Sequence, residues 1–311
     1  MIEAHGLSRS YGSFRALREA AFSARTGRVT ALLGHNGAGK TTCIRLLTGE
    51  LAPSAGRATI CGHDVLATPR AARAAAGYLP ESAPSYPEMR AIDYLLHRAA
   101  LEGLPRAKRR AAADRAIERC WLGEVRRKRI SALSKGYRQR VGLAAAILHD
   151  PPAIILDEPA SGLDPAQIVE TRNLVRELAS DKAVLLSSHI LSDVEAACDD
   201  VVVLARGRVR AAGPLSEIAS GSARPSVVAE VHANADAAGA LAASIQAADP
   251  ASVEPRGEWT RLTLTGAGDV REPLARAAAG AGLLLRELTL ATPPLERVLL
   301  DLLEPPPEDR G

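Results

Sequence analysis

Eight consecutive residues near the start of the chain have the composition of a phosphate-binding loop. The segment Gly34-His35-Asn36-Gly37-Ala38-Gly39-Lys40-Thr41 follows the pattern GxxxxGK[ST]. Its glycines let backbone N–H groups converge on phosphates without clashes from Cβ atoms, and the N-terminus of the next helix adds partial positive charge. We expect Lys40 to reach the β- and γ-phosphates and the Thr41 hydroxyl to coordinate Mg²⁺. The nucleotide-binding residues predicted in this segment are Gly34, His35, Asn36, Gly37, Ala38, Gly39, Lys40, Thr41 and Thr42.

Two adjacent carboxylates end the apolar segment Ile154-Ile155-Leu156-Asp157-Glu158. At the end of a buried strand, Asp157 would hold Mg²⁺ directly or through water. Glu158 points to the opposite side of the pleat, which places a second carboxylate beside the γ-phosphate, where a general base could activate the attacking water. The alternative is an acid pair that only caps a strand end. The phosphate-binding loop upstream favours the catalytic interpretation.

A single histidine, His189, follows the run Leu185-Leu186-Ser187-Ser188 at the end of a further expected strand. A lone histidine there is more often structural than catalytic. Its place after the loop and the acid pair reverses that preference, and we expect its imidazole N–H to sense the γ-phosphate.

A second anion-binding element is predicted in Leu133-Ser134-Lys135-Gly136-Tyr137, where a turn enters a helix expected over residues 138–148. Ser134 could be an N-cap and nothing more, but the helix N-terminus would still be an anion site. This element lies too far along the chain to belong to the first loop. A protein that carries both can close one nucleotide between two copies of itself.

Strands that alternate with helices are expected to position these side chains. Buried strands are predicted over residues 29–33, 153–156, 184–187 and 201–204, with a helix over 41–48. This alternation predicts a mostly parallel α/β sheet and gives the loop its strand–loop–helix context. Residues 84–133 are rich in Arg and Ala and predict an inserted helical subdomain, whose Arg-rich runs at 108–110 and 126–129 are interpreted as solvated helix faces.

A linker of small residues at 220–225 separates a smaller unit from this core. The unit has the order strand, helix, strand, strand, helix, strand, which predicts a small α+β ferredoxin-like domain. We therefore expect an ATPase domain over residues 1–220, an accessory domain over 221–303 and a disordered tail over 304–311, where prolines and acidic residues cannot pack.

The composition is that of a globular protein of 311 residues with 24% charged residues and a net charge of +3. So small a charge argues against a nucleic-acid partner. The four cysteines have neither CxxC spacing nor a histidine at ligand spacing, which predicts reduced and mostly buried thiols. We expect no signal peptide and find no apolar run long enough to cross a membrane.

In their order and type these segments resemble the nucleotide-binding subunit of an ATP-binding cassette (ABC) transporter, over roughly residues 2–218. The matching parts are Tyr11 as the adenine-stacking aromatic, the Walker A loop at 34–41, the Q-loop at Tyr78-Leu79-Pro80-Glu81, the signature at 133–137, Walker B at 154–158, the D-loop at 161–164 and His189 as the switch histidine.

One branch of the family is especially similar. Residues 162–170, 188–195 and 294–298 look like those of subunits that serve ABC-2-type permeases, including multidrug, gliding-motility and copper-processing ATPases. The resemblance implies a P-loop ATPase that uses ATP and Mg²⁺, pairs head to tail with a second copy and drives a separate integral-membrane ABC-2-type permease in export. It also implies a cytoplasmic location, peripheral on the inner face of the membrane. In the pair, Ser134 and Gly136 meet the γ-phosphate held by the other copy.

Two positions depart from the family pattern. Glu81 stands where most members have Gln, whose side-chain oxygen contacts Mg²⁺ and the attacking water. Because Glu keeps an oxygen, we expect activity to survive and predict Glu81 as a catalytic and metal-contacting residue. In the signature, Lys135 and Tyr137 replace Gly and Gln, and Lys135 brings a positive charge close to the phosphate.

Two other functions fit less well. A soluble ABC ATPase that acts on ribosomes or DNA usually has two cassettes or long coiled-coil arms, whereas this chain has one cassette and no sustained heptads. A regulatory protein with an inactive ATPase is disfavoured by the intact set of Lys40, Asp157, Glu158 and His189.

Overall fold

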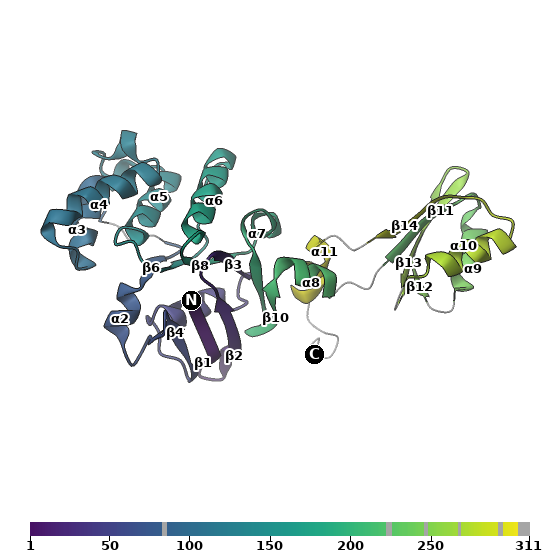
Figure 1. The fold of residues 1–311 in the computed structure, drawn as a ribbon, viewed down its shortest axis with the longest axis horizontal. Helices are drawn as coiled ribbons and strands as arrows, with labels where there is room; N and C mark the ends of the chain where they lie inside the picture. The colour runs from purple at the N-terminus through teal and green to yellow at the C-terminus, as the bar shows by residue number, and fades with distance from the viewer. Residues whose placement is uncertain (83–85, 222–225, 246–247, 267–268, 292–294, 304–311) are drawn as a thin grey trace. The chain divides into compact units, whose positions relative to one another are not determined.

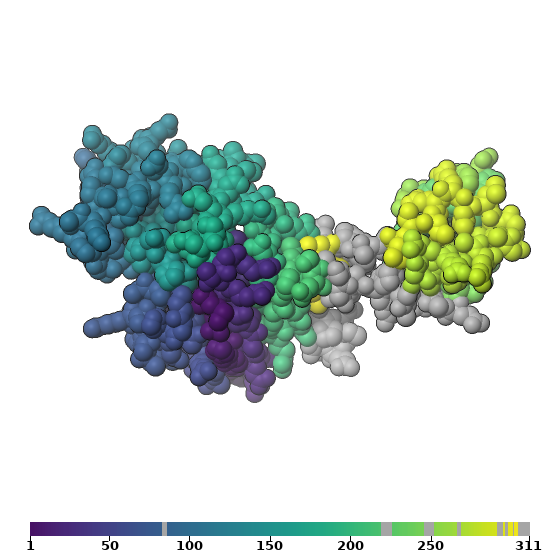
Figure 2. Space-filling model, in the orientation of Figure 1, coloured from purple at the N-terminus to yellow at the C-terminus, as the bar shows by residue number. Residues whose placement is uncertain are grey.

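The computed structural model describes residues 1–82, 86–221, 226–245, 248–266, 269–291 and 295–303. The chain forms two compact units, Met1–Leu215 with Leu302–Gly311, and Ser216–Asp301. Figure 1 labels the elements of each unit, and Figure 2 shows the surface that their side chains form. The disorder expected for residues 304–311 and the part of the linker at 222–225 lie outside the described residues.

A six-stranded sheet with the order β10-β9-β3-β8-β7-β6 forms the centre of the first unit. Its strands are β3 (Arg28–Leu33), β6 (Ala76–Leu79), β7 (Ala153–Leu156), β8 (Ala183–Ser188), β9 (Asp200–Ala205) and β10 (Arg208–Pro214). All neighbours are parallel except β9 and β10. Every residue of β7, β8 and β9 is buried, as in a parallel sheet covered on both faces. The predicted α/β sheet is confirmed.

An antiparallel sheet that the sequence patterns did not predict packs against the helix α1 (Lys40–Leu47). Its order is β2-β1-β4-β5, with β1 (Ile2–Tyr11), β2 (Phe14–Ala24), β4 (Ala55–Ile60) and β5 (His63–Asp64). The register between β1 and β2 shifts three times. Each shift moves the inward-facing positions by one residue, so neither strand has the simple alternation of apolar and polar residues that predicts a strand.

The helical subdomain contains α3 (Ala91–Leu101), α4 (Arg106–Arg119) and the short 3₁₀ turns η1 (Gly123–Val125) and η2 (Ile130–Ala132). The helix α5 (Lys135–Ala146) follows and packs on both α3 and α4, as Figure 1 shows. Three further helices, α2 (Pro69–Ala74), α6 (Pro165–Ala179) and α7 (Leu191–Ala197), complete the unit. The helix expected at 138–148 begins three residues earlier, because Ser134 accepts a hydrogen bond from the backbone N–H of Tyr137 and caps it.

The second unit has the antiparallel order β12-β13-β11-β14. Its elements are β11 (Ser226–Val231), α9 (Ala235–Ala243), β12 (Ala248–Arg256), β13 (Trp259–Gly266), α10 (Arg271–Gly280) and β14 (Leu285–Ala291). This chain order and strand order are those of a ferredoxin-like fold, as predicted. Two helices flank it in the sequence, α8 (Leu215–Gly221) and α11 (Leu295–Leu303), and α11 was not predicted.

Candidate functional site

The phosphate-binding loop runs from the end of β3 to the start of α1, and close packing fixes its shape. Gly37 and Gly39 have φ angles of 81° and 107°, a region that side chains rarely adopt. A Cβ atom on Gly39 would lie 2.6 Å from the backbone oxygen of Ala16, and one on Gly34 would lie 2.5 Å from that of Leu204. The neighbouring strands therefore demand glycine at both ends of the loop.

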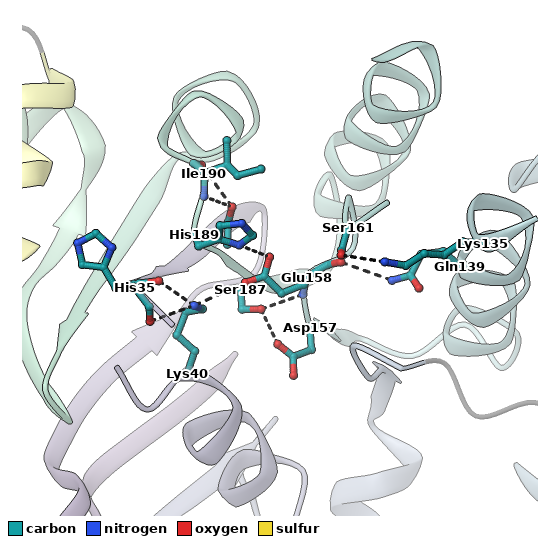
Figure 3. A network of polar contacts seen from close by, with 12 residues as sticks. His35, Lys40, Lys135, Gln139, Asp157, Glu158, Ser161, Ser187, His189 and Ile190 are labelled. Carbon is teal, nitrogen blue, oxygen red and sulfur yellow. Dashed lines mark hydrogen bonds and ion pairs between the residues drawn. The ribbon is translucent and has the colours of Figure 1, made fainter. Parts of the chain in front are cut away.

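Lys40 lies at the centre of the loop with its side chain folded over it. The residue is 6% exposed. Its Nζ donates to the backbone oxygens of Gly34 at 2.7 Å and His35 at 3.4 Å, and it lies 3.6 Å from Oε1 of Glu158 (Figure 3). The ammonium group is thus held against the first two carbonyl groups of the loop, and the carboxylate of Glu158, just beyond β7, already faces it.

The two carboxylates at the end of β7 meet a serine of β8. The Ser187 hydroxyl donates to Oδ1 of Asp157 at 2.6 Å and accepts from the backbone N–H of Glu158 at 2.8 Å. Glu158 has a φ of 49°, in the left-handed region. Its Oε2 lies 2.9 Å from Nδ1 of His189, whose side chain is 45% exposed. The Glu158 carboxylate therefore lies within reach of both Lys40 and His189.

The acid pair carries an electrostatic cost. Burial raises the pKa of Asp157, the hydrogen bond from Ser187 opposes that shift, and the negative charges of Glu81 and Glu158 add to it. Glu81 itself is exposed, one residue beyond Pro80 at the end of β6. Several carboxylates and one lysine thus share a small volume, and a divalent cation would relieve their repulsion.

The oxygen atoms of Thr41, Asp157 and Glu81 fit Mg²⁺, which takes one or two carboxylates together with substrate phosphates. Within the described residues, no three His, Cys, Asp or Glu side chains are arranged to hold a metal by themselves. All four cysteines are free, and burial raises the pKa of Cys43, Cys120 and Cys198 to about 12, which keeps these thiols protonated and makes them weak nucleophiles.

The second predicted anion element lies at the N-terminus of α5. Ser134 is the N-cap, and Gly136 lies in the first turn, where a Cβ atom would meet Oε1 of Gln167 at 2.3 Å. The Nζ of Lys135 lies 3.5 Å from the Ser161 hydroxyl. The sequence did not reveal this contact between the signature and the D-loop, because the two segments are far apart along the chain.

Tyr11 ends β1, where the residue is 46% exposed, and the guanidinium of Arg9 lies 4.9 Å from its ring centre. An exposed aromatic face beside a cation is available for stacking. The structure records no contact that joins Tyr11 to the loop residues, so its role stays a prediction.

Two polar residues that contact the backbone of Glu158, Ser187 and Gln139, were not among the predicted site residues. The Ser187 hydroxyl accepts from the Glu158 backbone N–H, and Nε2 of Gln139 lies 3.5 Å from the Glu158 backbone oxygen. Both are far from the acid pair in the sequence, and the available signal was that Ser187 comes two residues before His189 and Gln139 two residues after Tyr137.

A separate cavity of about 440 Å³ lies between the sheet core and the helical subdomain. Residues of β6, α3 and α5 line it, among them Tyr78 and Tyr94, together with His149, which follows α5. Its charged residues are Glu50, Arg73, Arg98 and Glu102. Burial raises the pKa of both tyrosines, and burial lowers the pKa of His149. This cavity is lined about equally by apolar and polar side chains and does not contain the loop or the acid pair.

A glycine-rich loop between a parallel strand and a helix, with a lysine facing a strand-end acid pair, defines a P-loop ATPase. Residues 17–161 match the family described as ABC transporter. The chain is 38% identical over 218 residues to an uncharacterised ABC transporter ATP-binding protein, YxlF of Bacillus subtilis, and covers 72% of it with 70% of its own length. The protein belongs to the ABC transporter family, as an ATP-binding subunit that hydrolyses ATP.

Two other relatives agree with this assignment. The bacitracin transport ATP-binding protein BcrA of Bacillus licheniformis is 34% identical, and the match covers 67% of this chain and 68% of that protein. The solved structure of an ATP-binding subunit of an ABC transporter has a TM-score of 0.66 and 32% identity, and the match covers 71% of this chain and 92% of that one. None of the helices in the described part of the chain is both long and apolar enough to span a bilayer.

Proposed function

We propose that this protein is the ATP-hydrolysing motor of an ABC-2-type membrane exporter, in which two copies pair head to tail and drive a separate permease. The observation that carries the proposal is the position of the Glu158 carboxylate, which lies 3.6 Å from Nζ of Lys40 and 2.9 Å from Nδ1 of His189. The name of one relative states bacitracin transport, which supports a role in transport, and that of another states Nod factor export, which supports the direction.

The residues of one copy supply the parts of a phosphoryl transfer to water. Lys40 would exchange its ion pair with Glu158 for the β- and γ-phosphates, which frees that carboxylate to accept the proton of the attacking water. The water oxygen bonds to the γ-phosphorus as the bond from that phosphorus to the bridging oxygen of ADP breaks. His189 donates through Nδ1 to Glu158, because a carboxylate can only accept, and so orients the base.

Mg²⁺, held by Thr41, Asp157 and Glu81, would neutralise charge on the β- and γ-phosphate oxygens. Tyr11 would stack on the adenine, and the backbone of residues 34–42 would hold the phosphates. The packing that forces glycine at positions 34 and 39 supports the role of the loop. The role of Asp157 is supported by its place beside Glu158 and by the burial that raises the pKa of its carboxyl.

The second copy completes the site. Ser134 and the backbone of Gly136 lie at the N-terminus of a twelve-residue helix, α5. A helix N-terminus favours an anion, and the γ-phosphate of an ATP bound to the other copy is the anion that this pairing supplies. The functional unit is then a dimer with two ATP molecules in its interface.

The permease is expected to contact the cavity between the sheet core and the helical subdomain. Its mixed lining suits a short segment that carries both apolar and charged side chains. Tyr78 and Pro80 belong both to this cavity and to the segment that leads to Glu81. A movement at the nucleotide would therefore reach the permease through residues 78–81, and the subunit would lie at the inner face of the membrane.

For the rest of the chain we propose an ATPase domain of residues 1–220 and an accessory domain of residues 221–303 that supports or regulates the dimer. Deletion of residues 222–311 tests that role. If the deletion variant dimerises, hydrolyses ATP and supports transport as the full chain does, the proposed role of the accessory domain is wrong.

The decisive experiment for the motor is Glu158→Gln, which keeps the shape of the side chain and removes its basicity. We expect MgATP binding to persist, turnover to fall by about 10²–10⁴-fold and an ATP-bound dimer to accumulate in size-exclusion chromatography. Near-normal turnover in this variant would exclude Glu158 as the base. Absence of ATPase stimulation by a co-purified permease would exclude the transport motor instead.

A further inference from the structure

A buried serine beside the acid pair belongs to none of the motifs that the sequence revealed. Strands β7 and β8 are parallel with Leu156 opposite Leu186. Asp157 and Ser187 are the next residues along the two strands, so they are adjacent at the edge where the site lies. Ser187 has no exposed surface. Water therefore cannot replace the bonds that its hydroxyl makes.

The direction of both hydrogen bonds of this hydroxyl is determined by its partners. An ionised carboxylate can only accept and a backbone N–H can only donate. Ser187 must therefore give its single proton to Oδ1 of Asp157, at 2.6 Å, and accept from the N–H of Glu158, at 2.8 Å. One hydroxyl thus joins the side chain of the first acid to the backbone of the second (Figure 3).

Glu158 needs such an anchor because its backbone is strained. A left-handed conformation is unfavourable for any residue with a Cβ atom, and the φ of Glu158 is 49°. On the other side of the same residue, its carbonyl oxygen accepts from the backbone N–H of Ser161 at 3.0 Å. Relaxation of this φ would rotate the Glu158 carboxylate away from His189 and Lys40, which it now meets at 2.9 and 3.6 Å.

We propose that Ser187 is a positioning residue for ATP hydrolysis, which holds Glu158 in its strained conformation and fixes the rotation of the Asp157 carboxylate. Because Oδ1 of Asp157 accepts from the Ser187 hydroxyl, the carboxylate cannot turn freely about its bond to Cβ. Ser187 acts through these two residues and not on the nucleotide. The inference rests on the proposed role of Glu158 as general base.

The test compares Ser187→Ala and Ser187→Cys with Ser187→Thr in the full-length protein. The first two remove the strong hydroxyl bonds, and we expect kcat to fall by about 10–100-fold, with KM for MgATP changed far less. Ser187→Thr keeps the hydroxyl and should restore most of the rate. Thr30→Val is the matched control, because Thr30 is a fully buried residue of the neighbouring strand β3 whose hydroxyl has no hydrogen-bond partner among the described residues.

A second readout needs neither nucleotide nor turnover. Hydrogen exchange of the Glu158 backbone amide, measured by NMR, should be slow in the wild-type protein and in Ser187→Thr, and faster in Ser187→Ala and Ser187→Cys. Thr30→Val should leave it unchanged. Equal protection in all variants, or full turnover in Ser187→Ala, would overturn the positioning role.

The same experiment with Glu158→Gln separates the two proposals. If Glu158→Gln is slow and Ser187→Ala lowers kcat by a smaller factor in that background than in the wild-type protein, both hold. If Glu158→Gln is slow while Ser187→Ala alone is as fast as Thr30→Val, only the role of Ser187 fails. If Glu158→Gln turns over normally, the base assignment fails and the positioning role fails with it.

Discussion

The phosphate-binding loop makes a quantitative prediction, because two different costs of replacing its glycines can be separated. Alanine at Gly39 would take a left-handed conformation, φ 107°, which costs about 1–2 kcal/mol. Its Cβ would also lie 2.6 Å from the backbone oxygen of Ala16, and relieving such overpacking costs about 1–3 kcal/mol more. We expect Gly39→Ala to lower the free energy of unfolding by about 2–5 kcal/mol.

Gly62 provides the control for the first of these costs. Its φ is 82°, and a Cβ atom there would have no neighbour within 4 Å. Gly62→Ala should therefore cost only the conformational part, about 1–2 kcal/mol. Gly37, with φ 81° and equally open surroundings, places the same strain inside the loop. Gly37→Ala should therefore lower the free energy of unfolding as much as Gly62→Ala does, and it should also weaken nucleotide binding.

Urea unfolding followed by tryptophan fluorescence measures these differences. The chain has two tryptophans, and a Trp259→Phe background leaves Trp121, which reports on the first unit alone. Nucleotide affinity follows from the anisotropy of a fluorescent ATP analogue. If Gly39→Ala is no less stable than Gly62→Ala and binds ATP as tightly as the wild type, the packing of β2 against the loop is not what requires glycine there.

Two further predictions concern the acid pair and the signature. Because burial raises the pKa of Asp157, the folded protein holds that proton more tightly than the unfolded chain, and stability falls as pH rises through the raised pKa. Asp157→Asn should remove this part of the pH dependence, and at neutral pH it should be at least as stable as the wild type. Thermal unfolding in acidic and neutral buffers checks both expectations. The variant should also lose Mg²⁺-dependent ATP hydrolysis. Ser134→Asn keeps the N-cap of α5, so stability should hold while ATP-induced dimerisation weakens, which light scattering measures. If Ser134→Asn still dimerises normally with ATP, Ser134 only caps α5 and does not contact the nucleotide of the other copy.

The parts of the fold that follow from the sequence are those with strong, uninterrupted patterns. The strands β7 and β8 are short apolar runs that end in polar residues, and the sequence places them within one residue. The sheet formed by β1, β2, β4 and β5 lacks such a pattern, because its register shifts and its strands alternate poorly. The helix α11 was missed for a different reason, since residues 294–298 were interpreted only as a stretch similar to one branch of the family.

Within the site, residue types predicted the chemistry, whereas geometry came only from the structure. The spacing of Lys40, Asp157, Glu158 and His189 identifies the parts of an ATPase. It does not reveal that Glu158 adopts a left-handed backbone or that Ser187 holds it there. Those features depend on the register of two strands that are about thirty residues apart in the sequence, and no local pattern records that register.

Lys135 shows how a substitution in a motif can act through a partner that the motif does not contain. From sequence, its charge was expected close to the phosphate of the other copy. In the structure its Nζ lies 3.5 Å from the Ser161 hydroxyl, and a Cβ atom on Gly162 would lie 2.6 Å from Cδ of Lys135. The lysine stem thus occupies the space that Gly162 leaves open. Lys135 therefore connects the signature to the D-loop of the same chain. The distance between its ammonium group and a bound phosphate would depend on the position of that D-loop.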